Sequence, residues 1–260
     1  MKMLSRNQAK EIVASNGDLS DCDLSGTNLS ELDLSAMQLI RSNLSRADIS
    51  KAVLIRTDLS GSELISANLG VSNLTGAVLN RCNLTMTDLS FSTLIGANFG
   101  AAILTGANLS LSNLSCSVFR NADLTEANLR QAETSGADFS ESQMIKVNAY
   151  GATMAGSNLS GTNLDNSILT KADLTAADLS GANLKNVELI NANFTAADLT
   201  DADLRGAKLA GSNFTRAKID GIVLDEDIKL SILKIIISFN QAYRREGFLR
   251  KASSRLLSLP

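Results

Sequence analysis

The chain has 260 residues, 44% of them hydrophobic and 20% charged, and a formal net charge of −3. It contains no histidine, which excludes Ser-His-Asp triads, histidine general bases and histidine metal ligands. No apolar run approaches the roughly 18 residues of a membrane-spanning helix, and no signal-peptide hydrophobic region precedes the repeats described below, so we expect a cytoplasmic protein that does not contact membranes.

Residues 1–16 are expected to form an amino-terminal cap. The segment 5–15 is predicted to be a short helix, because Ser5 and Gln8 have the spacing of a capping box. Ile12 and Val13 would supply its apolar surface, and Gly17 would end it. Such a cap is needed if the following repeats leave an open edge.

From Leu19 to Leu224 an apolar residue recurs at every fifth position except at Thr134, in 42 consecutive units of which 31 have leucine at the centre. We number each unit from its apolar centre, i. Position i−2 is small, i−1 is mostly Asp or Asn, i+1 is often Ser or Thr, and i+2 is variable and often Gly. A period of five fits neither a helix nor a flat strand, so each unit must turn the chain.

If each unit turns the chain through roughly a right angle, four units close one coil and the chain returns above its start every twenty residues. Positions i and i−2 would then point inward. Phenylalanine centres support this closure, because they recur at intervals of twenty and would stack as core rings. They are Phe99, Phe119 and Phe139 in one column, and Phe194 and Phe214 in another.

Units such as Gly106-Ala107-Asn108-Leu109-Ser110 and Lys171-Ala172-Asp173-Leu174-Thr175 resemble the pentapeptide-repeat family over about residues 17–224. The resemblance implies an all-β fold, a right-handed quadrilateral β-helix. The unit count then gives about ten coils, and the strand spacing gives a rod of roughly 50 Å. The weakest stretch is expected at 134–154, where Thr134, Met144, Ala149 and Met154 replace leucine. Either local repacking or a bend or notch near Tyr150 would accommodate them.

Residues 225–260 are expected to form a carboxyl-terminal helix followed by a basic tail. An apolar face recurs at helical spacing, and it is wider than one cap surface needs. It suggests a homodimer interface formed by Ile228, Ile232, Ile235, Ile236, Phe239 and Tyr243. A simple capping helix and a basic amphipathic membrane contact are the alternatives.

The residues provide no catalytic constellation, no cofactor-binding motif and no metal-ligand set, so we expect a non-enzymatic protein without a cofactor. The three cysteines, Cys22, Cys82 and Cys116, are not placed to form a disulfide, which fits a reducing compartment. Function must then come from surface charge. Residues 17–224 carry a net charge of −8, residues 1–16 carry +2 and residues 225–260 carry +3.

The resemblance extends to the quinolone-resistance members of the family, which mimic DNA and occupy the DNA-binding saddle of DNA gyrase. It implies a gyrase or topoisomerase IV partner, quinolone-type or toxin resistance, and no direct binding of nucleic acid. The candidate partner-binding carboxylates are Asp173, Asp178, Asp198 and Asp203. A basic girdle (Arg41, Arg46, Lys51 and Arg56) interrupts the negative field. The alternatives are a secreted bacterial effector or host-interaction scaffold, and a structural or regulatory protein with another partner.

Overall fold

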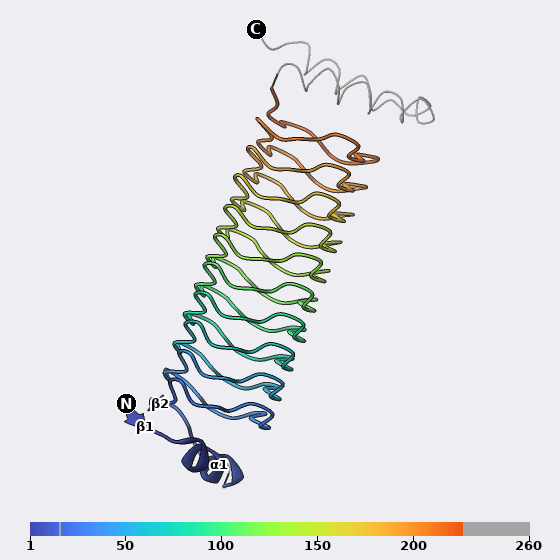
Figure 1. Ribbon diagram of the computed structural model, residues 1–260. Helices are drawn as coiled ribbons and strands as arrows, with labels where there is room; N and C mark the ends of the chain where they lie inside the picture. Colours follow the sequence, from blue (N-terminus) through green and yellow to red (C-terminus); the bar gives the residue numbers. More distant parts are fainter. Residues whose placement is uncertain (16, 226–260) are drawn as a thin grey trace.

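The computed structural model describes residues 1–15 and 17–225, and within them the chain forms one straight rod of stacked coils (Figure 1). Two short strands, β1 (Lys2–Met3) and β2 (Cys22–Asp23), pair in parallel at the amino-terminal end. Between them lies helix α1 (Arg6–Ala14). The residues expected to form the carboxyl-terminal helix and dimer interface, from Ile228 to Tyr243, lie outside the described residues.

Helix α1 covers the first coil. Ser5 is its N-cap, and the capping box with Gln8 is formed in both directions. Leu4 and Ala9 are buried against the end of the core. The chain then returns closely past the helix at Gly17, where an added Cβ would lie only 2.7 Å from Cγ2 of Ile12. The open edge of the first coil is therefore occupied by a non-repeating segment.

Successive coils are joined by parallel bridges between residues twenty apart, from Asp23↔Asn43 to Asp203↔Val223. Each side of a coil contributes one bridged residue, at position i−1. Because the chain turns again directly after each bridge, these contacts stay isolated bridges rather than extended strands. The fold is thus a β-helix with four sides per twenty-residue coil, as the spacing of the phenylalanines predicts.

Every backbone amide of a typical unit has a partner, which explains the residue preference at i−1. The amides of i−1, i and i+2 donate to carbonyls of neighbouring coils, and that of i−2 donates to the preceding centre. The amide of i+1 donates to the Asp or Asn side chain at i−1. For the units around Leu44, these are Asn43 N to Cys22 O (2.9 Å), Leu44 N to Glu63 O (2.7 Å), Arg46 N to Ile65 O (2.9 Å), Ala47 N to Leu44 O (3.0 Å) and Ser45 N to Asn43 Oδ1 (3.1 Å).

The corner of each unit is the i+2 residue, whose backbone is left-handed. Gly26 has φ of 63°, but residues with a Cβ take the same conformation, such as Arg46 at 60° and Val71 at 62°. Glycine adopts this region freely, whereas other residues are strained in it and branched ones most of all. The corner side chains are also the most exposed ones of the repeat.

The core consists of the i and i−2 side chains, and the predicted phenylalanine columns are confirmed. The rings of Phe99 and Phe119 stack at 4.6 Å between centroids with an interplanar angle of 1°, and those of Phe119 and Phe139 at 4.8 Å and 6°. Phe194 and Phe214 stack at 4.8 Å and 7°. This geometry follows directly from the twenty-residue coil.

The unit centres of the stretch 134–154 are fully buried, and the stretch continues the rod without a bend (Figure 1). In the unit centred on Ala149, the i−2 position holds Val147 where most units have a smaller residue. The larger side chain at i−2 fills part of the space that leucine would occupy at the centre. The Thr134 hydroxyl donates to the carbonyl of Thr153 at 3.1 Å. Of the two expectations, local repacking is the one observed.

Among the described residues, the hydroxyl of Ser142 is the buried side-chain group that lacks a hydrogen-bond partner.

Candidate functional site

The interior of the rod offers no place for chemistry. With the exception of Ser142, buried serines and threonines at inward i−2 positions donate their hydroxyls to backbone carbonyls, as Ser42 does to Leu19 O at 2.7 Å. Burial raises the pKa of the Cys82 thiol to about 12, which leaves it without nucleophilic character at neutral pH. Within residues 1–15 and 17–225, no group of three or more Cys, Asp and Glu side chains is arranged to hold a metal ion.

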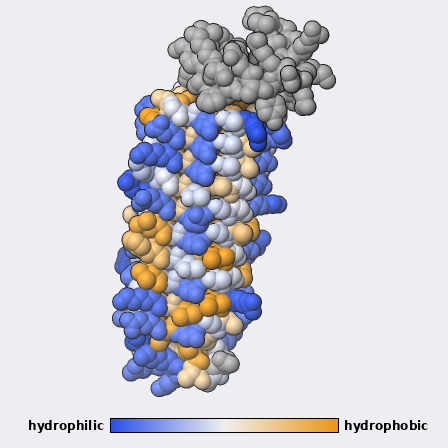
Figure 2. All heavy atoms as spheres, turned by 90° about the vertical axis from the view of Figure 1, so that its right-hand side faces the viewer, coloured by the Kyte–Doolittle hydropathy of each residue, from blue (hydrophilic) through white to orange (hydrophobic). Residues whose placement is uncertain are grey.

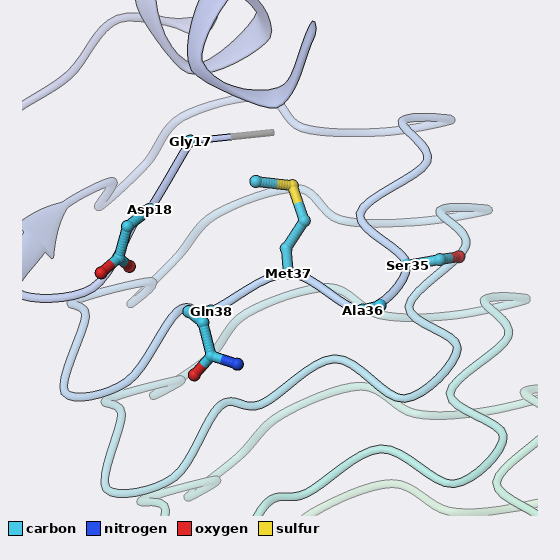
Figure 3. Close-up of a pocket in the computed structure, with 6 residues that line it drawn as sticks. All are labelled: Gly17, Asp18, Ser35, Ala36, Met37 and Gln38. Atoms are coloured by element: carbon cyan, nitrogen blue, oxygen red, sulfur yellow. The ribbon is translucent and has the colours of Figure 1, made fainter. Parts of the chain in front are cut away.

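A shallow hollow lies between α1 and the first coils, and Figure 3 shows its lining of Gly17, Asp18, Ser35, Ala36, Met37 and Gln38. Met37 extends into it beneath the segment at Gly17 (Figure 3). The side chain of Asp18 is held by Ser20, whose hydrogen bonds lower the pKa of that carboxyl. The polar side chains do not converge on a common point (Figure 3), so this hollow lacks the features of a ligand site.

The four carboxylates predicted to bind a partner lie on three adjoining sides of the rod near its carboxyl-terminal end. Asp178 and Asp198 are bridged to one another on one side. Asp173 is bridged to Asn193 on the preceding side, and Asp203 to Asn183 on the following side. The structure therefore places Asp178 next to Asp198, with Asp173 and Asp203 flanking this pair.

Two of these carboxylates are neutralised by cations within the chain. Lys218 Nζ lies 2.8 Å from Asp198 Oδ2 and, with the Thr200 hydroxyl, lowers the pKa of that carboxyl to about 2. Arg205 lies 2.6 Å from Asp203 and likewise lowers its pKa to about 2. Asp173 and Asp178 instead accept hydrogen bonds from neutral groups, as from the Ser180 amide at 2.9 Å.

The basic girdle occupies the four corners of one coil, and all four of its side chains are exposed. Arg41 forms a bidentate contact with Asp21 one coil away, through Nε at 2.9 Å and Nη2 at 2.6 Å.

Tyr150 is half-buried, with the guanidinium of Arg130 4.5 Å and the Lys171 ammonium 5.6 Å from its ring centre. The ring is thus covered by cations rather than open as a notch.

Sequence reasoning missed an apolar surface between these charged regions. Residues 61–119, which we call the uncharged belt, contain only three charged side chains, those of Glu63, Arg81 and Asp88. Exposed hydrophobic residues occupy its corners, and hydrophobic side chains interrupt the hydrophilic surface in the same half of the rod (Figure 2). They would have been visible in the sequence written in rows of twenty, which puts Val71, Phe91 and Leu111 in one column.

The described part of the chain holds no helix with the length and apolarity that crossing a bilayer requires.

A family model described as pentapeptide repeats matches the chain in eight copies, at residues 18–54, 38–81, 57–90, 72–110, 92–131, 122–161, 150–186 and 188–225. A search of curated proteins finds no match.

Among solved structures, the chain is similar to HetL, a pentapeptide repeat protein involved in heterocyst differentiation regulation from the cyanobacterium Nostoc sp. strain PCC 7120. The identity is 28% over 86% of this chain and 98% of HetL, with a TM-score of 0.48. Full-length QnrB1, a plasmid-mediated fluoroquinolone resistance protein, is 18% identical over 82% of this chain and 95% of its own, with a TM-score of 0.43. With TM-scores below 0.5, these structures add nothing to the family match.

Proposed function

Because this chain belongs to the pentapeptide-repeat family, we propose that it is a rigid, non-enzymatic rod that binds DNA gyrase or topoisomerase IV in place of DNA. Proteins of this family fold as right-handed β-helices and are generally structural or interaction proteins without enzymatic activity. The proposal places the protein in the cytoplasm, where these enzymes act on the chromosome, and gives it a role in resistance to quinolone-type drugs or to toxins.

The observation that carries this proposal is the arrangement of carboxylates on the carboxyl-terminal coils. Asp173, Asp178, Asp198 and Asp203 follow three adjoining sides of the rod, as phosphates wind around a duplex. A basic protein surface that binds phosphates would be attracted to them. At Asp198 and Asp203 the partner must displace Lys218 and Arg205, so binding should concentrate on Asp173 and Asp178.

Supercoiling by purified bacterial gyrase, titrated with this protein with and without a fluoroquinolone, tests the proposal. The expected result is inhibition of supercoiling or protection from the drug. Replacement of all four aspartates by asparagine should remove the effect while keeping the fold, since an asparagine at i−1 still accepts the i+1 amide. A matched variant with Asp23, Asp33, Asp48 and Asp58 replaced by asparagine should keep the effect on gyrase.

Equal activity of the two asparagine variants would contradict the assignment of the site. A folded natural chain without effect in either arm of the titration would contradict the gyrase proposal itself.

A second candidate is a structural or regulatory protein that binds a different protein partner. The uncharged belt favours it, because a mimic of DNA needs negative charge along its length and residues 61–119 supply almost none. On the main proposal, contact with gyrase is limited to the coils on the carboxyl-terminal side of the belt. Dimerisation through Ile228–Tyr243 stays a prediction of the sequence, to be tested by deleting residues 228–260 and measuring the mass of the particle.

A further inference from the structure

Three apolar side chains form a ladder along one corner of the rod. Val71, Phe91 and Leu111 follow one another at intervals of one coil and are 59%, 60% and 46% exposed. Bridges Asn68↔Asp88 and Asp88↔Asn108 hold these coils in register. At the strand spacing of about 4.8 Å the ladder is roughly 10 Å long. Met86, 63% exposed, occupies the neighbouring corner of the middle coil.

Neither the core nor the backbone accounts for this ladder. The three side chains face away from the core, and their φ angles of 62°, 58° and 58° lie in the region where glycine or asparagine is least strained. Other coils have polar residues or glycine in this column, namely Glu31, Lys51, Gln131, Gly151, Lys171, Asn191 and Gly211. Contiguous exposed apolar side chains on a folded protein mark a contact surface.

We propose that the ladder binds a second copy of this chain, side by side and antiparallel, around a two-fold axis through Phe91. A two-fold contact must be complementary to itself. Val71 and Leu111 each lie one coil from Phe91, in opposite directions. The axis therefore places Phe91 against Phe91 and Val71 against Leu111 of the second copy, so that every rung of the ladder is covered.

The charges around the ladder select the antiparallel arrangement. In the corner column of Met86, Arg46 lies two coils before it and Glu126 two coils after it. On the antiparallel axis through Phe91, Arg46 comes level with the midpoint between Glu126 and Lys146 of the second copy. These two side chains form an ion pair at 3.4 Å, so Arg46 faces no net charge there. In a parallel pair this column would instead face the corner column that contains Arg56, two corners further along the chain. Arg46 would then approach Arg56 of the second copy. Repulsion between these like charges disfavours the parallel pair.

The proposed contact between the two copies is narrow, and its small buried area makes the association weak. Asp88 lies between Met86 and Phe91 but is half-buried, with its carboxylate accepting hydrogen bonds from the Ser90 amide at 3.0 Å and Asn108 Nδ2 at 3.1 Å. The corner side chains project beyond it, so the two rods meet along their corners. Four exposed apolar residues per copy cover less than the roughly 800 Å² per partner of a standard interface. The association is therefore concentration-dependent rather than obligate.

Sedimentation equilibrium of the full chain over a range of concentrations tests the proposal. The natural chain should associate as concentration rises. Phe91→Asp should halve the mass at concentrations where the natural chain is associated, because it buries a charge at the centre of the contact. Ala101→Asp, an exposed substitution at the diagonally opposite corner, should leave the mass unchanged. Equal masses for Phe91→Asp and the natural chain at every concentration would overturn the proposal, and so would a natural chain that stays monomeric.

Charge reversal tests the antiparallel arrangement separately. Arg56→Glu should leave the antiparallel association unchanged, because Arg56 comes level with uncharged Cys116 and Gly136 of the second copy. In a parallel pair the same change would place a carboxylate near Arg46 and strengthen association. Stronger association of Arg56→Glu than of the natural chain would overturn the antiparallel arrangement. These measurements report the mass of the particle alone, so their outcome is independent of whether gyrase is inhibited.

Discussion

The uncharged belt, residues 61–119, and the carboxyl-terminal coils, residues 161–220, have the same backbone and different surfaces. Both have bridges at every i−1 position, the same side-chain acceptors for the i+1 amide, and left-handed corners. The belt contains three charged residues, whereas the carboxyl-terminal coils contain fourteen. The backbone pattern therefore leaves the corner side chains free to vary, and at i−1 it asks for a side-chain acceptor that either Asp or Asn supplies. It follows that the inward positions specify the fold, whereas the corners and the charge at i−1 specify what the rod can bind.

The largest expected effect is a difference in the free energy of unfolding between variants of a buried and of an exposed phenylalanine. Phe119 is buried between two stacked rings, and Phe119→Ala should lower the free energy of unfolding by about 3–5 kcal/mol. Phe91→Ala, at an exposed corner, should change it by no more than about 0.5 kcal/mol. Urea unfolding of the two variants at low protein concentration gives the comparison. Similar losses in both would contradict the division between inner and outer positions.

A smaller effect should show how one coil tolerates an alanine centre. Ala149→Leu adds volume beside Val147, and overpacking of this kind costs about 1–3 kcal/mol. Val147→Ala combined with Ala149→Leu recreates the common pattern of a small residue at i−2 and leucine at i, as in Ala127 and Leu129. The double variant should therefore be more stable than either single variant in urea unfolding. Additive losses would show that the two volumes are not exchanged.

Much of this fold could be predicted from the sequence, because the inward positions repeat a physical requirement. The spacing of Phe99, Phe119 and Phe139 predicts their stacking, and the structure confirms it. Asp and Asn at i−1 are readable as turn residues, but their acceptor role for the i+1 amide needs the coordinates. The partners of Asp198 and Asp203 were missed, although Lys218 lies twenty residues beyond Asp198 and could have been found from the period.

The apolar ladder was missed for a different reason. Corner residues vary without any effect on the core, so no pattern within a single unit marks Val71 or Phe91 as unusual. Only their alignment in successive coils shows that they share one surface. The preference for left-handed backbone at i+2 is hinted at by the glycines there, but residues such as Arg46 hide it.

Strain at a belt corner should be measurable as a gain in stability. Val71 has a branched side chain and φ of 62°, and asparagine tolerates that region better. Val71→Asn should raise the free energy of unfolding by about 1 kcal/mol. Lys171→Asn, in the same column of a charged coil and also at φ of 62°, should gain less because lysine is unbranched. A loss of stability in Val71→Asn would contradict the strain assigned to this corner.

The smallest effect concerns the ion pairs of the charged coils. Arg205 lowers the pKa of Asp203 from 3.8 to about 2, so this carboxylate stabilises the folded chain above pH 3.8 and loses that contribution as pH falls through about 2. Asp203→Asn should cost less than about 1 kcal/mol near neutral pH, and only a small part of that near pH 2. Unfolding at the two pH values measures this difference. A cost that stays constant with pH would exclude the ion pair as its source.

Deletion of single coils, followed by sedimentation equilibrium, tests most directly the claim that every coil carries the fold and that the uncharged belt carries the side-by-side association. Removing residues 77–96 excises one coil with Met86 and Phe91, and removing residues 157–176 excises one coil beyond the belt; both junctions keep the five-residue register. We predict that both shortened chains fold and that the chain lacking 157–176 associates as the natural chain does. The chain lacking 77–96 should have half the particle mass of the natural chain at the same concentrations. Equal association of the two shortened chains would contradict the account.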